Sequence, residues 1–182
     1  FNILATLVLL PFANQLERLS FILIKPDDDE NALKEEDEIF ARLDERLLAT
    51  PSFALEQTSA CVLKMADLVE EAVNEAMTVI LDYDKQTVKR IEQREKLIDR
   101  YDDEVSGYLV KLSARNLTES DTMKLNQMLH GIGDLERIAD HAMNLGELAR
   151  SMNKKEQHFS SKAAEELRTF SRAVTDIVQM SV

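Results

Sequence analysis

Two short motifs of the same form, E-x-x-x-D, each place a pair of carboxylates one helical turn apart. The first, EKLID, contains Glu95 and Asp99, and the second, ERIAD, contains Glu136 and Asp140. Residues four apart lie on one face of a helix, where like charges repel each other. Carboxylates crowded in this way either take up protons through raised pKa values or bind cations. Carboxylate oxygens suit magnesium, calcium, manganese or iron, so the four acids predict a site for divalent or trivalent cations.

Both motifs lie at the edge of an apolar stripe when about 100° is allowed for each residue of a helix. The stripe beside the first motif contains Ile91, Ile98 and Val105, and the stripe beside the second contains Ile132 and Ala139. A carboxylate at the edge of a buried seam is costly unless another group compensates it. Two motifs with the same phase on neighbouring helices would therefore bring four acids together.

A simpler interpretation is that the acids are ordinary surface charges. Charged helices carry E-x-x-x-D by chance, and three arginines could form ion pairs with these acids: Arg94, Arg100 and Arg137. Further oxygen donors of lower priority lie close by in the sequence, namely Glu92, Asp102, Asp103 and Asn144. The sequence alone leaves both interpretations open.

The elements that must position these residues are long helices. Apolar residues recurring at spacings of three and four predict helices over about 52–83, 85–114 and 119–152, and a fourth from about 160 to the end. Thr118 to Asp121 has the form of a capping box at the start of the third helix. Short connections make the first three antiparallel neighbours. We therefore expect an all-α fold, with a three-helix bundle over 51–153 and the first helix of a second bundle over 158–182.

The first 50 residues differ from the rest. Residues 1–24 are largely apolar, and the sequence leaves open whether they form a core or amphipathic helix or the end of a transmembrane segment followed by an interfacial stretch. Residues 25–50 include the acidic run DDDENALKEEDE and are expected to form an acidic connector.

Composition and charge exclude several classes of function. The chain has 182 residues, 45% of them hydrophobic, with four glycines and a net charge of −12. Nucleic-acid binding depends on cationic side chains that neutralise phosphates, so no nucleic-acid partner is expected. No glycine-rich phosphate loop, nucleophile elbow or Glu-x-x-His motif occurs. We therefore do not expect an enzyme.

The motifs also resemble those of a known family. DLERIADHAMNL, from Asp134 to Leu145, resembles the third-helix signature of PhoU proteins, D/E-L-E-R-I-G-D-x-A-x-N, and EKLID resembles the acidic motif of their second helix. The chain departs from that signature at Ala139, where glycine is usual. The resemblance implies tandem three-helix bundles, metal clusters held by the acidic motifs, and regulation of phosphate uptake.

Two further stretches narrow the resemblance. LDERLLATPSFAL (43–55) and FNILATLVLLPF (1–12) are similar to the junction and the last transmembrane segment of bacterial sodium/phosphate cotransporters with a PhoU-like C-terminal domain. This implies a regulatory domain on the cytoplasmic side of the inner membrane, with an upstream transmembrane transport domain as its partner. Phosphate as a further ligand and a homodimer stay open. The alternatives are a free-standing PhoU-type adaptor that contacts a phosphate transporter or sensor kinase, and a plain helical scaffold without metal.

Overall fold

A computed structural model of the chain describes residues 37–181 and confirms the all-helical fold. The chain divides into two units, Phe1–Ile39 and Phe40–Val182, and the architecture below is that of the second. The predicted apolar segment 1–24 lies outside the described residues, as does most of the predicted connector. Within the described range, no helix is both long and apolar enough to cross a membrane.

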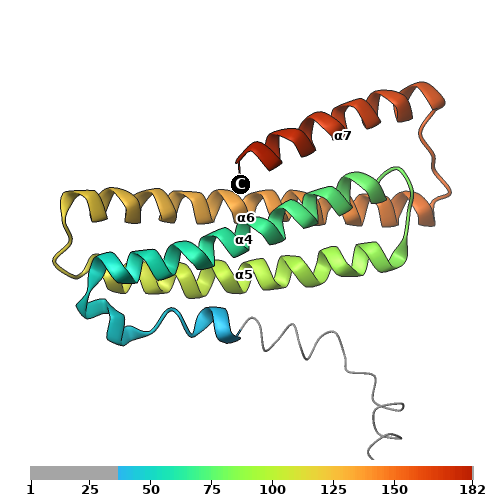
Figure 1. The fold of residues 1–182 in the computed structure, drawn as a ribbon. Helices are drawn as coiled ribbons and strands as arrows, with labels where there is room; N and C mark the ends of the chain where they lie inside the picture. The colour runs from blue at the N-terminus through green and yellow to red at the C-terminus, as the bar shows by residue number, and fades with distance from the viewer. Residues whose placement is uncertain (1–36, 182) are drawn as a thin grey trace, which may run out of the picture. The chain divides into compact units, whose positions relative to one another are not determined.

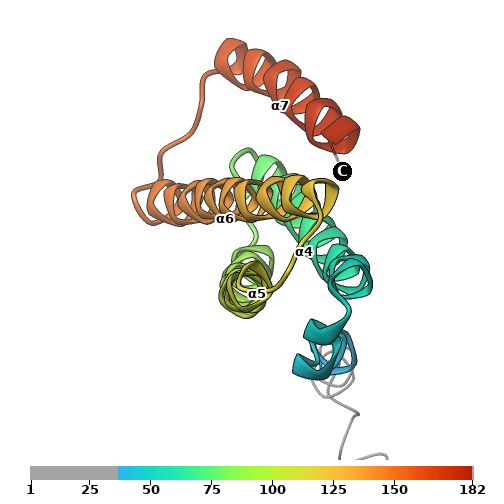
Figure 2. The same ribbon diagram turned by 90° about the vertical axis from the view of Figure 1, so that its left-hand side faces the viewer.

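Three long helices, α4, α5 and α6, lie side by side in an antiparallel bundle (Figures 1 and 2). Their bounds are Pro51–Val79, Lys85–Ser113 and Glu119–Lys154. A short 3-10 helix, η2 (Glu45–Ala49), precedes α4, and α7 (Ser161–Ser181) follows α6. The predicted bundle of three long helices is therefore confirmed.

Polar caps at the N-termini fix where the second and third helices begin. The Asp84 carboxylate accepts a hydrogen bond from the Thr87 N–H at 2.8 Å, and α5 starts at the next residue. At the start of α6, Thr118 Oγ1 accepts from the Asp121 N–H at 3.1 Å, as the predicted capping box requires. The Asp121 carboxylate also accepts from Ser52 Oγ on α4 at 3.0 Å, so one side chain joins the starts of two helices.

The first helix is shorter than the sequence predicts. It ends at Val79 instead of Tyr83, because the N–H groups of Leu81 and Asp82 both donate to the Thr78 carbonyl and close a turn. This turn leaves Asp84 in an extended conformation, from which its side chain caps α5. The chain thereby reverses within a few residues.

The core is made of aliphatic side chains from all three helices. Ile91, Ile98 and Ile132 are fully buried, and Ala139 is 2% exposed. Each buried aliphatic side chain contributes about 1.5–3 kcal/mol relative to an exposed one. Small residues on α6 allow close packing: a Cβ placed on Gly146 would lie 3.6 Å from Ile91 Cδ1. The bundle is therefore held mainly by this apolar seam.

Residues 40–49, at the end of the predicted connector, pack onto the bundle through a few side chains. The ring of Phe40 lies 4.6 Å from that of buried Tyr101 on α5, and the Arg100 guanidinium lies 4.5 Å from the Phe40 ring centroid. Two helical turns further along α5, the Tyr108 hydroxyl donates to the Asp44 carbonyl at 3.0 Å. We call residues 40–49 the strap, because they attach along the side of α5.

The fourth helix, α7, lies against α4 and leaves an apolar face exposed. Figure 2 shows it outside the triangle formed by α4, α5 and α6. Phe170 and Ile177 are 60% and 64% exposed, and Met180 is 88% exposed. Residues seven apart lie on one face of a helix, so this face forms a continuous apolar stripe.

Replacement of Gly146 by alanine is expected to stabilise the bundle. Alanine favours helix over glycine by about 1 kcal/mol, and its Cβ would make only ordinary van der Waals contact with Ile91 and Val88. Urea unfolding should show a gain of up to about 1 kcal/mol. Gly133→Ala, where nothing lies within 4 Å of the added Cβ, is the matched control for propensity alone. A loss of stability in Gly146→Ala with a gain in the control would contradict the packing described.

Candidate functional site

The two acidic motifs occupy the flank of the seam between α5 and α6. On α5, buried Ile91 and Ile98 turn Glu95 to the edge of the core, and on α6, buried Ile132 and Ala139 do the same for Glu136. Glu95 and Glu136 are half-buried, whereas Asp99 and Asp140 are exposed. The predicted phase of the motifs relative to the apolar stripes therefore agrees with the burial pattern.

The pKa values of three of these acids are affected by charges on both helices. Burial raises the pKa of Glu95, and the charges of Asp99 and Asp140 raise it further. Burial also raises the pKa of Asp99, and the charge of Asp140 adds to this effect. The pKa of Glu136 is raised by burial and then by Asp140, while the neighbouring Arg137 lowers it. The structure thus brings Glu95, Asp99, Glu136 and Asp140 into one local field, and we call these four residues the acidic cluster.

Two aspartates that the sequence ranked lower take part in the same field. The charges of Asp103 and Asp102 raise the pKa of Asp99, and Asp102 also raises that of Glu136. Asp102 lies three residues after Asp99 on α5, which is the spacing that would have indicated its involvement. Its carboxylate accepts a long hydrogen bond from Ser106 Oγ at 3.4 Å. The other lower-ranked donors contribute less: Asn144 is exposed, and Glu92 pairs with Arg150 of α6.

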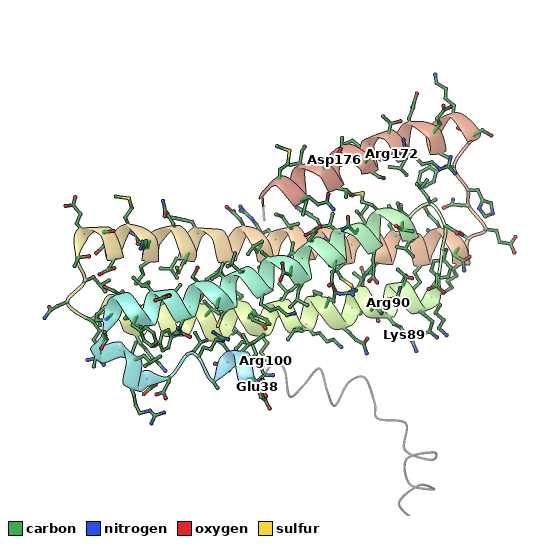
Figure 3. All side chains as sticks on the ribbon, viewed as in Figure 1. Glu38, Lys89, Arg90, Arg100, Arg172 and Asp176 are labelled. Atoms are coloured by element: carbon green, nitrogen blue, oxygen red, sulfur yellow. The ribbon has the colours of Figure 1, made fainter. Side chains whose placement is uncertain are left out.

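The arginines considered as partners of the cluster are engaged elsewhere. Arg94 bridges to α4, with Glu71 at 2.9 Å and with Glu75. Arg137 pairs with Asp134 at 2.7 Å. The Arg100 guanidinium lies over Phe40 in the strap. Arg90, labelled with Arg100 in Figure 3, also pairs with Glu75, at 2.7 Å. The surface ion pairs of the simpler interpretation are therefore directed mainly away from the acidic cluster.

The cluster is a concentration of negative charge and not an assembled coordination shell. Among residues 37–181, no three or more His, Cys, Asp or Glu side chains are arranged to hold a metal ion. The donor set is nevertheless of the kind that hard cations prefer, because every member is a carboxylate. Asp99 and Asp140 are exposed, so their side chains have room to change rotamer. A concentration of carboxylates of this kind favours nearby cations. In their absence, the ionised carboxylates are less stable than isolated ones, as the raised pKa values indicate.

Comparison with known proteins shows that the central part of the chain is similar to a domain family. Residues 62–149 match the PhoU domain, and this stretch includes the whole acidic cluster. The chain is 29% identical over 109 residues to a phosphate-specific transport system accessory protein PhoU homolog of Synechocystis sp., covering 58% of this chain and 47% of that protein. It is 22% identical over 106 residues to the homolog of Clostridium acetobutylicum, covering 57% of this chain and 48% of that one.

A third homolog, from Pseudomonas putida, is 27% identical over 96 residues, which cover 52% of this chain and 38% of that protein. The chain thus spans about half the length of the curated relatives it matches. No solved structure matches the chain significantly. The expected relation to PhoU proteins is confirmed at the level of the domain.

The raised pKa values predict how stability depends on pH in the absence of cations. A carboxyl whose pKa is higher in the folded state destabilises the fold when ionised, and this effect disappears as the pH falls through the folded pKa. Glu95, Asp99 and Glu136 are of this kind. Asp84 and Asp121 have lowered pKa values, and their stabilisation is lost only when the pH falls through those values, below about 4.

In EDTA, the melting temperature is therefore expected to be higher at about pH 5 than at pH 8. The double variant Glu95→Gln/Glu136→Gln should melt a few degrees higher than wild type at pH 8 and depend less on pH. Glu104→Gln/Glu147→Gln, which removes two exposed acids from the same two helices, is the matched control. Equal pH profiles for the three proteins would show that the cluster carries no such repulsion.

Proposed function

We propose that this chain is a regulatory part of a phosphate-uptake system, and specifically the PhoU-like domain of a sodium-dependent phosphate symporter. The observation that carries the proposal is the match of residues 62–149 to the PhoU domain. The relatives described as accessory proteins of a phosphate-specific transport system support a role in transport. The role proposed is regulatory and not catalytic.

Binding of a divalent or trivalent cation by the acidic cluster is the second part of the proposal. Glu95 and Asp99 of α5 and Glu136 and Asp140 of α6 would supply the carboxylate oxygens, and Asp102 lies close enough to add to the field. Iron, manganese, magnesium and calcium all accept such ligands. The charge of the cation would relieve the repulsion across the seam, and phosphate could then bridge to it.

A membrane-bound symporter is the preferred context, with the helical domain on the cytoplasmic side of the inner membrane and an upstream transmembrane domain as its partner. This choice depends on residues 1–24 and 43–55, of which the first lie outside the described range. The second candidate is a free-standing adaptor, and the description of the relatives as accessory proteins favours it. The exposed stripe on α7 supports a second bundle that begins at residue 158, because further helices would cover it.

Cation binding is tested with the full chain stripped of metal and titrated with manganese, magnesium and ferric iron. Wild type is expected to bind at least one of these cations, and Glu95→Gln/Glu136→Gln to bind it at least about tenfold more weakly, because two ligands lose their charge. The control Glu104→Gln/Glu147→Gln should bind as wild type does. Equal affinity in all three proteins, or no binding to wild type, would reject the metal site.

Regulation is tested in cells that express the intact gene under high and low external phosphate. Wild type is expected to change the rate of radioactive phosphate uptake between the two conditions, and the cluster variant Glu95→Gln/Glu136→Gln to lose that response while protein levels stay equal. Fractionation of the same cells separates the two contexts: recovery in membranes that resist salt washing supports the symporter, and recovery in the soluble fraction supports the adaptor. An unchanged response in the variant would count against regulation through the cluster.

A further inference from the structure

Three adjoining cavities run between α4 and α7, on the face of α7 opposite to its exposed stripe. The largest, of about 580 Å³, has Arg168 and Arg172 in its wall. Arg168 also lines a cavity of about 300 Å³ beside the turn between α4 and α5. Arg172 also lines one of about 260 Å³ towards the middle of α4. These two arginines, four residues apart, therefore lie at the junctions of one continuous groove.

Arg168 and Arg172 are exposed at the edge of this groove, and their guanidinium groups are unpaired within the described range. Neither Arg168 nor Arg172 makes an ion pair or a side-chain hydrogen bond with any residue that the structure describes. Other arginines of the bundle do so, including Arg90, Arg94 and Arg150. The groove is thus lined by two guanidinium groups whose N–H donors are available to a ligand.

The remaining walls combine apolar side chains, such as Met77 and Leu81, with a few polar groups. Ser171 lies between the two arginines and is 9% exposed, and its hydroxyl donates to the Leu167 carbonyl at 2.8 Å. The Thr78 hydroxyl donates to the Asn74 carbonyl at 2.9 Å. Two carboxylates line the groove: Asp82 borders both the largest cavity and the one beside the turn, and Asp176, labelled next to Arg172 in Figure 3, borders the third. The largest cavity contains two arginines and one aspartate, so its own balance is positive.

A structural role for the arginines is the competing interpretation. Cationic side chains near the C-terminus of a helix stabilise its dipole, and the groove runs past the C-terminus of α4. Within residues 37–181, however, neither guanidinium hydrogen-bonds a carbonyl there, and the last carbonyls of α4 accept from Ile80, Leu81 and Asp82 instead. Such a role would not explain why both groups face a space large enough for solvent and an ion. At about 30 Å³ for each water molecule, the largest cavity is large enough for a hydrated oxyanion.

We propose that the groove between α4 and α7 binds inorganic phosphate through the guanidinium groups of Arg168 and Arg172. The planar fork of an arginine matches the spacing of phosphate oxygens and can donate two parallel hydrogen bonds to them. The site contains no member of the acidic cluster and needs no metal ion. It gives a phosphate-uptake regulator a direct contact with the solute, but it does not depend on the proposed function.

The test is a titration of the full chain with sodium phosphate in EDTA, followed by NMR, with sodium chloride at equal ionic strength as the reference. Residues of α7 and the last turns of α4 are expected to shift with phosphate and not with chloride. The variant Arg168→Gln/Arg172→Gln should bind phosphate at least about tenfold more weakly, since charge-assisted hydrogen bonds are lost. Circular dichroism establishes that the variant remains helical.

Two further variants make the result specific. Arg115→Gln, which removes an exposed arginine at the end of α5, should bind phosphate as wild type does. Glu95→Gln/Glu136→Gln should also bind as wild type does, which separates this site from phosphate held by a metal at the acidic cluster. Equal shifts with chloride, or full binding by Arg168→Gln/Arg172→Gln, would overturn the inference. So would phosphate binding that requires added metal or is lost in Glu95→Gln/Glu136→Gln.

Discussion

Repulsion between carboxylates along the flank of α5 and α6 opposes the packing of these two helices. Burial raises the pKa values of Glu95, Asp99 and Glu136, and the charges of neighbouring acids on both helices raise them further. The opposing contribution is apolar: Ile91, Ile98 and Ile132 are fully buried in the same seam. At about 1.5–3 kcal/mol for each such side chain, packing exceeds the repulsion between partly exposed charges. The fold can therefore hold a strained acidic edge without a bound cation.

On the other faces of the bundle, ion pairs engage several arginines that could otherwise neutralise the acidic cluster. Arg90 and Arg94 are held by Glu71 and Glu75 on α4, and Arg150 crosses from α6 to α5. Individual surface pairs of this kind contribute little to stability, typically 0 to about 1 kcal/mol. These ion pairs matter more for position than for stability, because they hold the guanidinium groups away from the acidic cluster. An acidic patch with few cationic neighbours attracts cations from solution more strongly than one already neutralised.

The sequence predicted the long helices and the phase of both acidic motifs because these depend on local periodicity. The residues around Ile98 and Ala139 carry enough apolar repeats to define a buried face, and the Thr118 cap is recognisable from its neighbours. The sequence placed the end of the first helix at about Tyr83, because the apolar repeat continues through Ile80 and does not show that the turn already closes on Thr78. It gave Asp102 a lower priority, and the structure adds that the charges of Asp103 and Asp102 on α5, like that of Asp140 on α6, raise the pKa of Asp99. Features that depend on distant contacts, such as the strap and the groove beside α7, have no periodic signal.

The strap places Phe40 in direct contact with the part of α5 that carries Asp99. Phe40 is distant from Tyr101 in sequence, yet their rings are in contact, and Tyr101 follows Asp99 by only two positions. The covalent path from residue 40 to that aspartate runs the whole length of α4, round a turn and half-way along α5. Through space, a single aromatic contact, between Phe40 and Tyr101, connects the two regions. A displacement of α5 at the level of Asp99 would therefore bear directly on Phe40 through this ring contact.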